Sequence, residues 1–257
     1  MKPTDFDTLA TMSSASSQTS TGQQSRRAIT LAAEPMSVTF EPATTAVLVV
    51  DMQNDFGARG GMFDRAGIDI SGIQKAVAPT ARVLASARQA GIKIIYLKMG
   101  YRADLSDLGA ADSVNRVRHL QLGVGQTVKA PDGSESRILV RDTWNTEILP
   151  ELAPESGDEV LYKTRFSGFY KTDLDTHLAR LGIRHLVVTG CTTSVCVEST
   201  VRDAMFRDYL CVLLADCMSE PIGGQSSRTN HEASLLSTQV LLGWTSTSEA
   251  FVKAVSV

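Results

Sequence analysis

Three side chains that could act together in catalysis stand at or just beyond the ends of short apolar runs. Asp51 follows TAVLVV, Lys163 lies near the end of DEVLYKT, and Cys196 follows RHLVVTG across a short turn. Apolar runs without polar alternation are typical of strands buried on both faces, as in parallel sheets. Because ligands of open parallel sheets bind at the carboxyl ends of the strands, we expect a carboxylate, an ammonium and a thiol to meet there.

These three groups fit nucleophilic catalysis by the thiol. A free thiol has a pKa of about 8.5, whereas the thiolate is the reactive species. We expect a helix N-terminus and the Lys163 ammonium to lower the pKa of Cys196, and Asp51 to take the thiol proton as general base. Backbone N–H groups of the turn GCTTSVC could hold an oxyanion, so acyl transfer through a thioester is the predicted chemistry.

Each of the three residues also has a purely structural interpretation. Asp51 could cap a helix, Lys163 could be a solvated lysine at a strand end, and Cys196 could be a small buried hydrophobe. A purely structural interpretation of all three residues would require three coincidences at equivalent topological positions. The catalytic interpretation is therefore favoured.

The elements that must position these residues follow from the pattern of apolar runs. Helices are expected at 73–90, 172–182, 195–208 and 227–242, and strands at 45–51, 92–99, 158–164, 184–190, 209–216 and 243–247. This alternation predicts one α/β domain with a doubly wound, mostly parallel sheet and helices on both faces.

Two segments fall outside this alternation. Residues 1–38 include a Ser/Thr/Gln-rich stretch with few large apolar side chains, which predicts a flexible tail before a domain at 39–257. Residues 100–144 show no clear period, and a loop of that length is expected to be functional.

Composition limits the kinds of partner. The 257 residues carry a formal net charge of −3, and no basic excess indicates nucleic acid or an anionic membrane. The absence of a long apolar run or a signal-like start predicts a cytoplasmic protein without a membrane anchor. The spacings of the four cysteines and four histidines match no zinc pattern, so neither a metal nor a cofactor is expected, and the partner is a small-molecule substrate.

Three blocks carry a resemblance to a known family: VLVVDMQNDF, YKTRFSGFYKTDLD and VVTGCTTSVCVESTVRDAMFRDY. They resemble the signature blocks of the isochorismatase-like cysteine hydrolase superfamily, over roughly residues 43–255. The resemblance implies a six-stranded parallel sheet and a triad in which Asp51 is the base, Lys163 orients and polarises, and Cys196 is the nucleophile. It also implies a cis peptide between Cys191 and Thr192, an oxyanion hole from the N–H groups of Thr192 and Cys196, and a dimeric or tetrameric assembly.

Within the superfamily, GIRHLVVTG and LGWTSTSEAF are most similar to ureidoacrylate amidohydrolases, whereas YRADLSDL and RILVRDTWNTEILPEL resemble biuret hydrolases. The resemblance implies an amidohydrolase that cleaves a ureido, carbamoyl or amide C–N bond, with biuret and N-carbamoyl amino acids as alternative substrates. Nicotinamidases are disfavoured because residues 52–100 contain no histidine for a metal. Ser194 departs from the Asn or Asp usual at that position.

Several further residues are candidates for binding the substrate. Gln53 and Asn54 could hydrogen-bond a ureido group, and Phe56, Phe169 and Tyr170 could form the pocket walls. Three arginines are candidates for a substrate carboxylate: Arg102, Arg165 and Arg228. His119 and His231 have no evident partner and receive no role.

Two other classes of protein fit parts of the sequence. A thiol redox sensor would oxidise Cys196 and resolve it with Cys191 or Cys217. A nucleotide-binding domain is disfavoured, because the first strand leads into DMQNDFG rather than into a glycine-rich phosphate loop.

Overall fold

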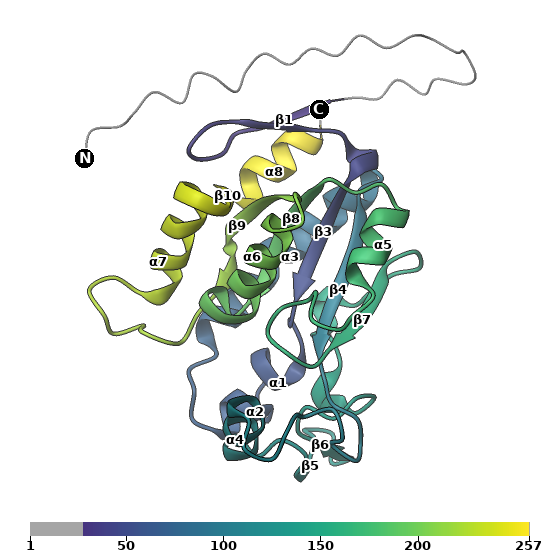
Figure 1. The fold of residues 1–257 in the computed structure, drawn as a ribbon, viewed down its shortest axis with the longest axis vertical. Coiled ribbons are helices and arrows are strands. Elements are labelled where there is room, and N and C mark those ends of the chain that lie inside the picture. The colour runs from purple at the N-terminus through teal and green to yellow at the C-terminus, as the bar shows by residue number, and fades with distance from the viewer. Residues whose placement is uncertain (1–27, 257) are drawn as a thin grey trace.

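The computed structural model describes residues 28–256, whose centre is a six-stranded sheet (Figure 1). All neighbouring strands are parallel, in the order β10-β9-β8-β3-β4-β7. The strands are β3 (Thr45–Val50), β4 (Lys93–Met99), β7 (Glu159–Lys163), β8 (His185–Cys191), β9 (Leu210–Ser219) and β10 (Gly243–Ser246). Each corresponds to one of the six apolar runs, so the predicted doubly wound sheet is confirmed.

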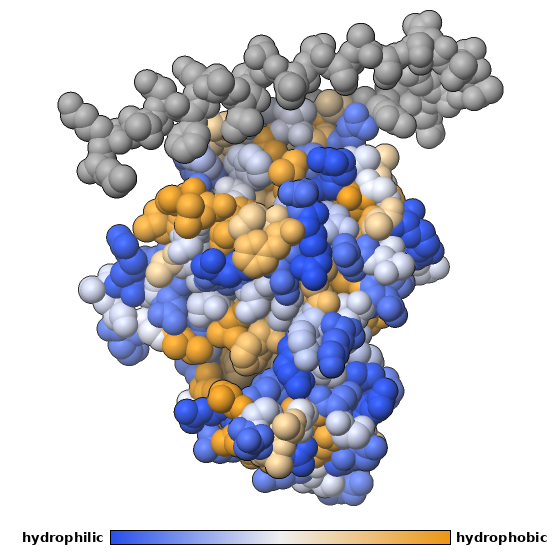
Figure 2. Space-filling view, in the orientation of Figure 1, coloured by the Kyte–Doolittle hydropathy of each residue, from blue (hydrophilic) through white to orange (hydrophobic). Residues whose placement is uncertain are grey.

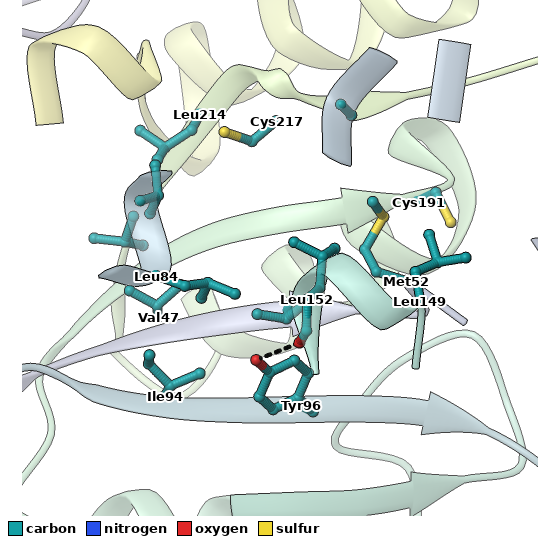
Figure 3. Packing of buried hydrophobic residues seen from close by; sticks show 14 of the residues in the cluster. Val47, Met52, Leu84, Ile94, Tyr96, Leu149, Leu152, Cys191, Leu214 and Cys217 are labelled. Carbon is teal, nitrogen blue, oxygen red and sulfur yellow. Dashed lines mark hydrogen bonds between the residues drawn. The ribbon is translucent and has the colours of Figure 1, made fainter. Parts of the chain in front are cut away.

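Helices cover both faces of the sheet, which explains why its strands are apolar throughout. Successive residues of a strand point to opposite faces. Val47 and Val49 of β3 belong to the hydrophobic cluster that includes α3 (Ser71–Gln89) and α8 (Ser248–Val255). Figure 3 shows part of this cluster, where the Tyr96 hydroxyl donates to the Leu152 carbonyl at 2.8 Å.

The opposite face packs against a second cluster. Leu48 and Val50 of β3 join apolar residues of α5 (Leu174–Arg180) and α6 (Glu198–Met205) there. A π-helical turn, η5 (Thr193–Val197), precedes α6 directly. The predicted helix at 195–208 is therefore this turn together with α6.

The predicted helix at 227–242 likewise has two parts, α7 (Asn230–Ser237) and the π-helical turn η6 (Thr238–Leu242). It begins at a capping box in which Thr229 and Glu232 bond each other's backbone N–H groups. None of the helices within residues 28–256 is long and apolar enough to cross a membrane.

The domain begins earlier than the sequence predicts. The strand β1 (Ile29–Leu31) pairs antiparallel with β2 (Val38–Phe40), and Glu34 forms a bridge with Thr245 on β10. Leu31 and Phe40 are buried. The tail expected over 1–38 is therefore wrong for residues 28–38, whose strands are too short to give a recognisable pattern. Residues 1–27 lie outside the described part of the chain.

Small elements gather beyond the carboxyl ends of the strands, in the lower part of Figure 1. We call these residues, 52–70 and 100–152, the cap. Its elements are α1 (Asn54–Gly57), α2 (Met62–Arg65), α4 (Val114–Gln121), β5 (Thr127–Lys129), β6 (Glu135–Arg137) and the 3-10 turns η3 (Trp144–Thr146) and η4 (Pro150–Leu152). The aperiodic stretch 100–144 thus contains a helix and a hairpin. A further 3-10 turn, η2 (Pro42–Thr44), precedes β3.

The buried carboxylate of Asp55 ties separate segments of the cap together. Its oxygens accept hydrogen bonds from the backbone N–H of Met62 at 2.9 Å, the backbone N–H of Leu139 at 2.7 Å, and the side-chain amide of Asn145. Burial raises the pKa of Asp55 to about 6, although all three donors oppose the shift.

This pKa predicts how stability depends on pH. Between about pH 4 and pH 6 the folded protein keeps a proton that the unfolded chain has released, so the free energy of unfolding falls as pH rises through that window. A pKa shift of this size changes the free energy of unfolding by on the order of 3 kcal/mol across that window. Urea unfolding of the wild type and of Asp55→Asn should therefore show a wild-type advantage that shrinks as pH rises. Replacing the exposed Asp112 by Asn is the control, and a difference between wild type and Asp55→Asn that stays constant with pH would contradict this assignment.

Candidate active site

Asp51 lies at the carboxyl edge of the sheet, directly after β3. Its backbone N–H donates to the Leu97 carbonyl of β4 at 2.8 Å, and its side chain is fully buried. Its φ of 52° is a left-handed conformation that costs about 1–2 kcal/mol in a residue other than glycine. The chain thus leaves β3 through a strained turn at Asp51, the residue that carries the buried carboxylate.

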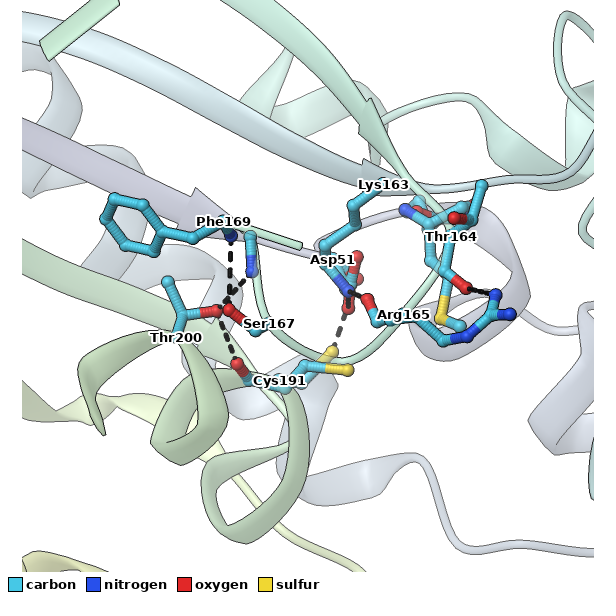
Figure 4. Close-up of polar contacts among 12 residues, drawn as sticks. Asp51, Lys163, Thr164, Arg165, Ser167, Phe169, Cys191 and Thr200 are labelled. Atoms are coloured by element: carbon cyan, nitrogen blue, oxygen red, sulfur yellow. Dashed lines mark hydrogen bonds and ion pairs between the residues drawn. The ribbon is translucent and has the colours of Figure 1, made fainter. Parts of the chain in front are cut away.

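Lys163 is the last residue of β7, two strands away from β3 in the sheet. Its side chain is buried, and Nζ lies 2.7 Å from Asp51 Oδ2 and 3.3 Å from the Arg165 carbonyl oxygen (Figure 4). The parallel register places Lys163 opposite Met99 of β4. The ion pair therefore spans β4 just beyond the end of that strand.

Cys196 lies in the η5 turn that connects β8 to α6, and only 5% of the residue is exposed. The Asp51 carboxylate and the Cys196 thiol each influence the pKa of the other group. Asp51 Oδ2 is occupied by Lys163, whereas Oδ1 is buried without a hydrogen-bond partner among residues 28–256. This oxygen is the atom available to receive a proton.

The electrostatics favour a protonated thiol in the resting site. Burial raises the pKa of Cys196, and the opposing charge of Lys163 does not outweigh it. Burial also raises the pKa of Asp51, opposed by Lys163, while the pKa of Lys163 rises because its anionic neighbours outweigh burial. Lys163 does lower the thiol pKa, as expected, but burial and the neighbouring charge of Asp51 outweigh it, so the net shift is upward.

Backbone and side-chain contacts of the residues just before η5 fix the position of this turn. The peptide between Cys191 and Thr192 is cis, as the resemblance implies, and Cys191 Sγ donates to the Asp51 carbonyl oxygen at 3.2 Å. The N–H groups of Val195 and Val197 both donate to the Thr192 carbonyl oxygen at 3.2 Å.

Two residues that sequence reasoning did not select hold the same turn. Glu220 Oε2 accepts the backbone N–H of Ser194 at 2.9 Å and also its hydroxyl, while Oε1 accepts the N–H of Ile222 at 2.9 Å. His231 Nδ1 lies 2.9 Å from Thr193 Oγ1. Both partners come from distant parts of the chain, so no local motif could have indicated them.

A pocket of about 340 Å³ opens over the triad and is walled mainly by apolar residues of the cap and the neighbouring loops. Figure 2 shows hydrophobic residues gathered in a hollow between the upper body of the molecule and its lower part. Asp51, Cys196 and Thr192 line it together with Phe56, Met62, Phe63, Met99, Arg118, His119, Phe166 and Ile222.

The pocket contains only some of the residues selected from sequence. Phe56 lines it as expected. Gln53 instead bonds both the N–H and the carbonyl of Met99, at 2.8 and 2.9 Å, and Asn54 donates to the Trp144 carbonyl at 2.7 Å. Both amides therefore hold the backbone around the site.

Two expected aromatic walls lie outside the pocket. Phe169 stacks on Tyr209 at 5.9 Å in the cluster around α5 and α6, and Tyr170 is 42% exposed. Phe166, only a few residues earlier in the chain, lines the pocket in their place. The chain turns away from the pocket after Phe166, which the sequence alone does not show.

The arginine candidates also differ from expectation. Arg165 donates to the carbonyl oxygens of Thr164 and Asp107, while Arg102 and Arg228 are exposed, and none of the three lines the pocket. Arg118 of α4 does line it. The described residues contain no cluster of three or more His, Cys, Asp or Glu suited to a metal ion.

Comparisons with known proteins agree with this architecture. Residues 45–250 match the family described as Isochorismatase domain. Ureidoacrylate amidohydrolase RutB of Variovorax paradoxus is 39% identical over 87% of this chain and 86% of its own, and RutB of Serratia proteamaculans is 38% identical over 89% of each chain.

Solved structures give the same result. A cysteine hydrolase from Pseudomonas syringae pv. phaseolicola is 30% identical with a TM-score of 0.71, over 84% of this chain and 94% of its own. N-carbamoylsarcosine amidase from Thermoplasma acidophilum is 25% identical with a TM-score of 0.57, over 80% and 97%. The chain belongs to the isochorismatase family. It is an enzyme of the hydrolase class that acts on non-peptide C–N bonds.

The ion pair predicts the consequence of removing the lysine. In Lys163→Met, Asp51 would be buried without its partner, so its pKa would rise further and the carboxyl group would stay protonated. We expect carbamidomethylation of Cys196 by iodoacetamide at neutral pH to slow by about 10–100-fold. Peptide mass spectrometry measures this rate. Lys171→Met removes an exposed lysine and is the matched control, and an unchanged rate in Lys163→Met would refute the role of the ion pair.

Proposed function

We propose that this protein is a cysteine-dependent amidohydrolase of a small ureido or carbamoyl compound of the ureidoacrylate type, acting through a thioester. The observation that carries the proposal is a pocket lined by Asp51 and Cys196, in which Asp51 forms a buried ion pair with Lys163. The similarity to relatives named ureidoacrylate amidohydrolase over most of both chains supports the substrate class.

In the first step, the thiol proton passes to Asp51 Oδ1 while Cys196 Sγ forms a bond to the substrate carbonyl carbon. The carbonyl electron pair moves onto oxygen, where the backbone N–H groups of Thr192 and Cys196 stabilise the negative charge. Transfer from thiol to carboxylate leaves the total charge of the triad unchanged. The Lys163 ammonium at 2.7 Å keeps Asp51 ionised beforehand and stabilises the charge that develops nearby.

In the second step, the intermediate collapses and the C–N bond breaks. The proton held by Asp51 moves to the departing nitrogen, which leaves as ammonia or an amine, and Cys196 keeps the acyl group as a thioester. Asp51 then takes a proton from water, the water oxygen bonds to the acyl carbon, and the C–S bond breaks. The sulfur recovers a proton and the acid is released.

Biuret and N-carbamoyl amino acids are alternative substrates of the same chemistry. The structural similarity to N-carbamoylsarcosine amidase supports a carbamoyl group in either case. No comparison favours the redox sensor. The cytoplasmic location and the dimeric or tetrameric assembly stay predictions from the sequence.

A product assay tests the proposal. The purified protein is given ureidoacrylate, biuret, N-carbamoyl amino acids and nicotinamide separately, and ammonia and the acid product are quantified. We expect turnover of a ureido or carbamoyl substrate, reduced by about 10⁴-fold or more in Cys196→Ala because the covalent route is lost. Cys211→Ala, a buried cysteine of β9, should keep its activity. A fully active Cys196→Ala protein would disprove the mechanism.

A further inference from the structure

His119 is a buried pocket residue that the proposed mechanism does not use. It lies on α4, only 6% of it is exposed, and it lines the same pocket as Cys196. The Tyr101 ring packs edge-on against its imidazole at a centroid distance of 5.5 Å, and the Phe166 ring lies at 6.0 Å. These contacts fix the ring in one orientation.

The hydrogen bonding of the ring sets its tautomer. Nδ1 lies 2.6 Å from the Asn115 carbonyl oxygen, which can only accept, so Nδ1 carries the proton and Nε2 has the free lone pair. No group within residues 28–256 bonds Nε2, and this atom is not enclosed by protein. Burial lowers the pKa of His119, and the charges of Lys163 and Arg165 lower it further, which keeps the ring neutral.

The rest of the pocket supplies few acceptors. Its wall is mainly apolar, and the lining side chains with strong acceptor atoms are Asp51, Thr192 and His119. Asp51 accepts a hydrogen bond from Lys163, and in the proposed mechanism it also receives the thiol proton. A ureido compound carries N–H donors on both sides of its carbonyl group, and a buried donor without a partner is costly.

We propose that His119 is a positioning residue whose Nε2 accepts a hydrogen bond from an N–H of the ureido group, and that this bond selects ureido compounds over analogues lacking that N–H. The inference rests on the proposed function and makes it more specific. The neighbouring Arg118 lies on the exposed side of the same pocket and donates to Gln121 at 3.2 Å, so α4 presents one inner acceptor and one outer cation.

The test compares three substrates of equal size: the ureido compound, its analogue with the bridging N–H replaced by oxygen, and its analogue with the terminal amino group replaced by methyl. The value of kcat/KM is measured for wild type, His119→Phe, His119→Gln and Arg116→Gln. Phenylalanine keeps an aromatic ring between Tyr101 and Phe166 but has no acceptor, whereas glutamine keeps an acceptor near the Nε2 position. Arg116 lies on the same helix outside the pocket lining and is the control.

We expect His119→Phe to lose about 10–100-fold in kcat/KM on the ureido compound and much less on one of the two analogues. His119→Gln should recover part of the preference, and Arg116→Gln should match the wild type. Unchanged preference ratios in His119→Phe for both analogues would overturn the proposal. Unchanged ratios mean that all three substrates lose the same factor in kcat/KM, which would indicate a structural role alone.

Failure of the proposed function would look different. The wild type would then leave every ureido substrate intact while iodoacetamide still labelled Cys196. If His119→Phe does not fold, as judged by thermal unfolding, the preference ratios of His119→Gln decide the question. Ratios equal to those of an apolar replacement, His119→Leu, would exclude an acceptor role.

Discussion

The proposed active site depends on one buried ion pair. Asp51 and Lys163 are almost completely removed from water and lie 2.7 Å apart. Burying either charge alone would cost several kcal/mol, so the fold must bring the ends of β3 and β7 together across β4. The strained turn at Asp51 and the two hydrogen bonds between Gln53 and Met99 both support this geometry. The contacts of Gln53 and Met99 thereby help to determine the position of the Asp51 carboxylate.

Charge balance explains the resting state of the nucleophile. A carboxylate, an ammonium and a neutral thiol sum to zero, and moving the thiol proton to Asp51 leaves that sum unchanged. The site therefore does not have to store a thiolate in a region where burial disfavours it. In the proposed mechanism the thiol proton passes to Oδ1 of Asp51, which has no hydrogen-bond partner within residues 28–256.

The sequence predicts the scaffold better than it predicts the pocket walls. Wholly apolar strands are a local signal, and each of the six runs became a strand. Which side chains face a pocket depends on how the connections turn, and there the prediction failed for Phe169 and Tyr170. Polar residues beside the base, Gln53 and Asn54, bind backbone groups instead of facing the pocket. The wall residue His119 lies in a stretch whose folding is set by contacts such as those of Asp55, which no periodicity reveals.

The amino-terminal hairpin has a consequence for how the chain can be shortened. β10 is the outer strand of the sheet, and Glu34 exchanges two backbone hydrogen bonds with Thr245 along it, at 2.8 and 3.0 Å. Unpaired groups on an outer strand are templates for association with another chain. The segment before Val38 therefore covers part of this outer edge and limits its association with another chain. A protein that begins at residue 39, where composition alone places the start of the domain, would keep Asp51, Lys163 and Cys196. It would also expose backbone groups of β10 to pairing with another chain.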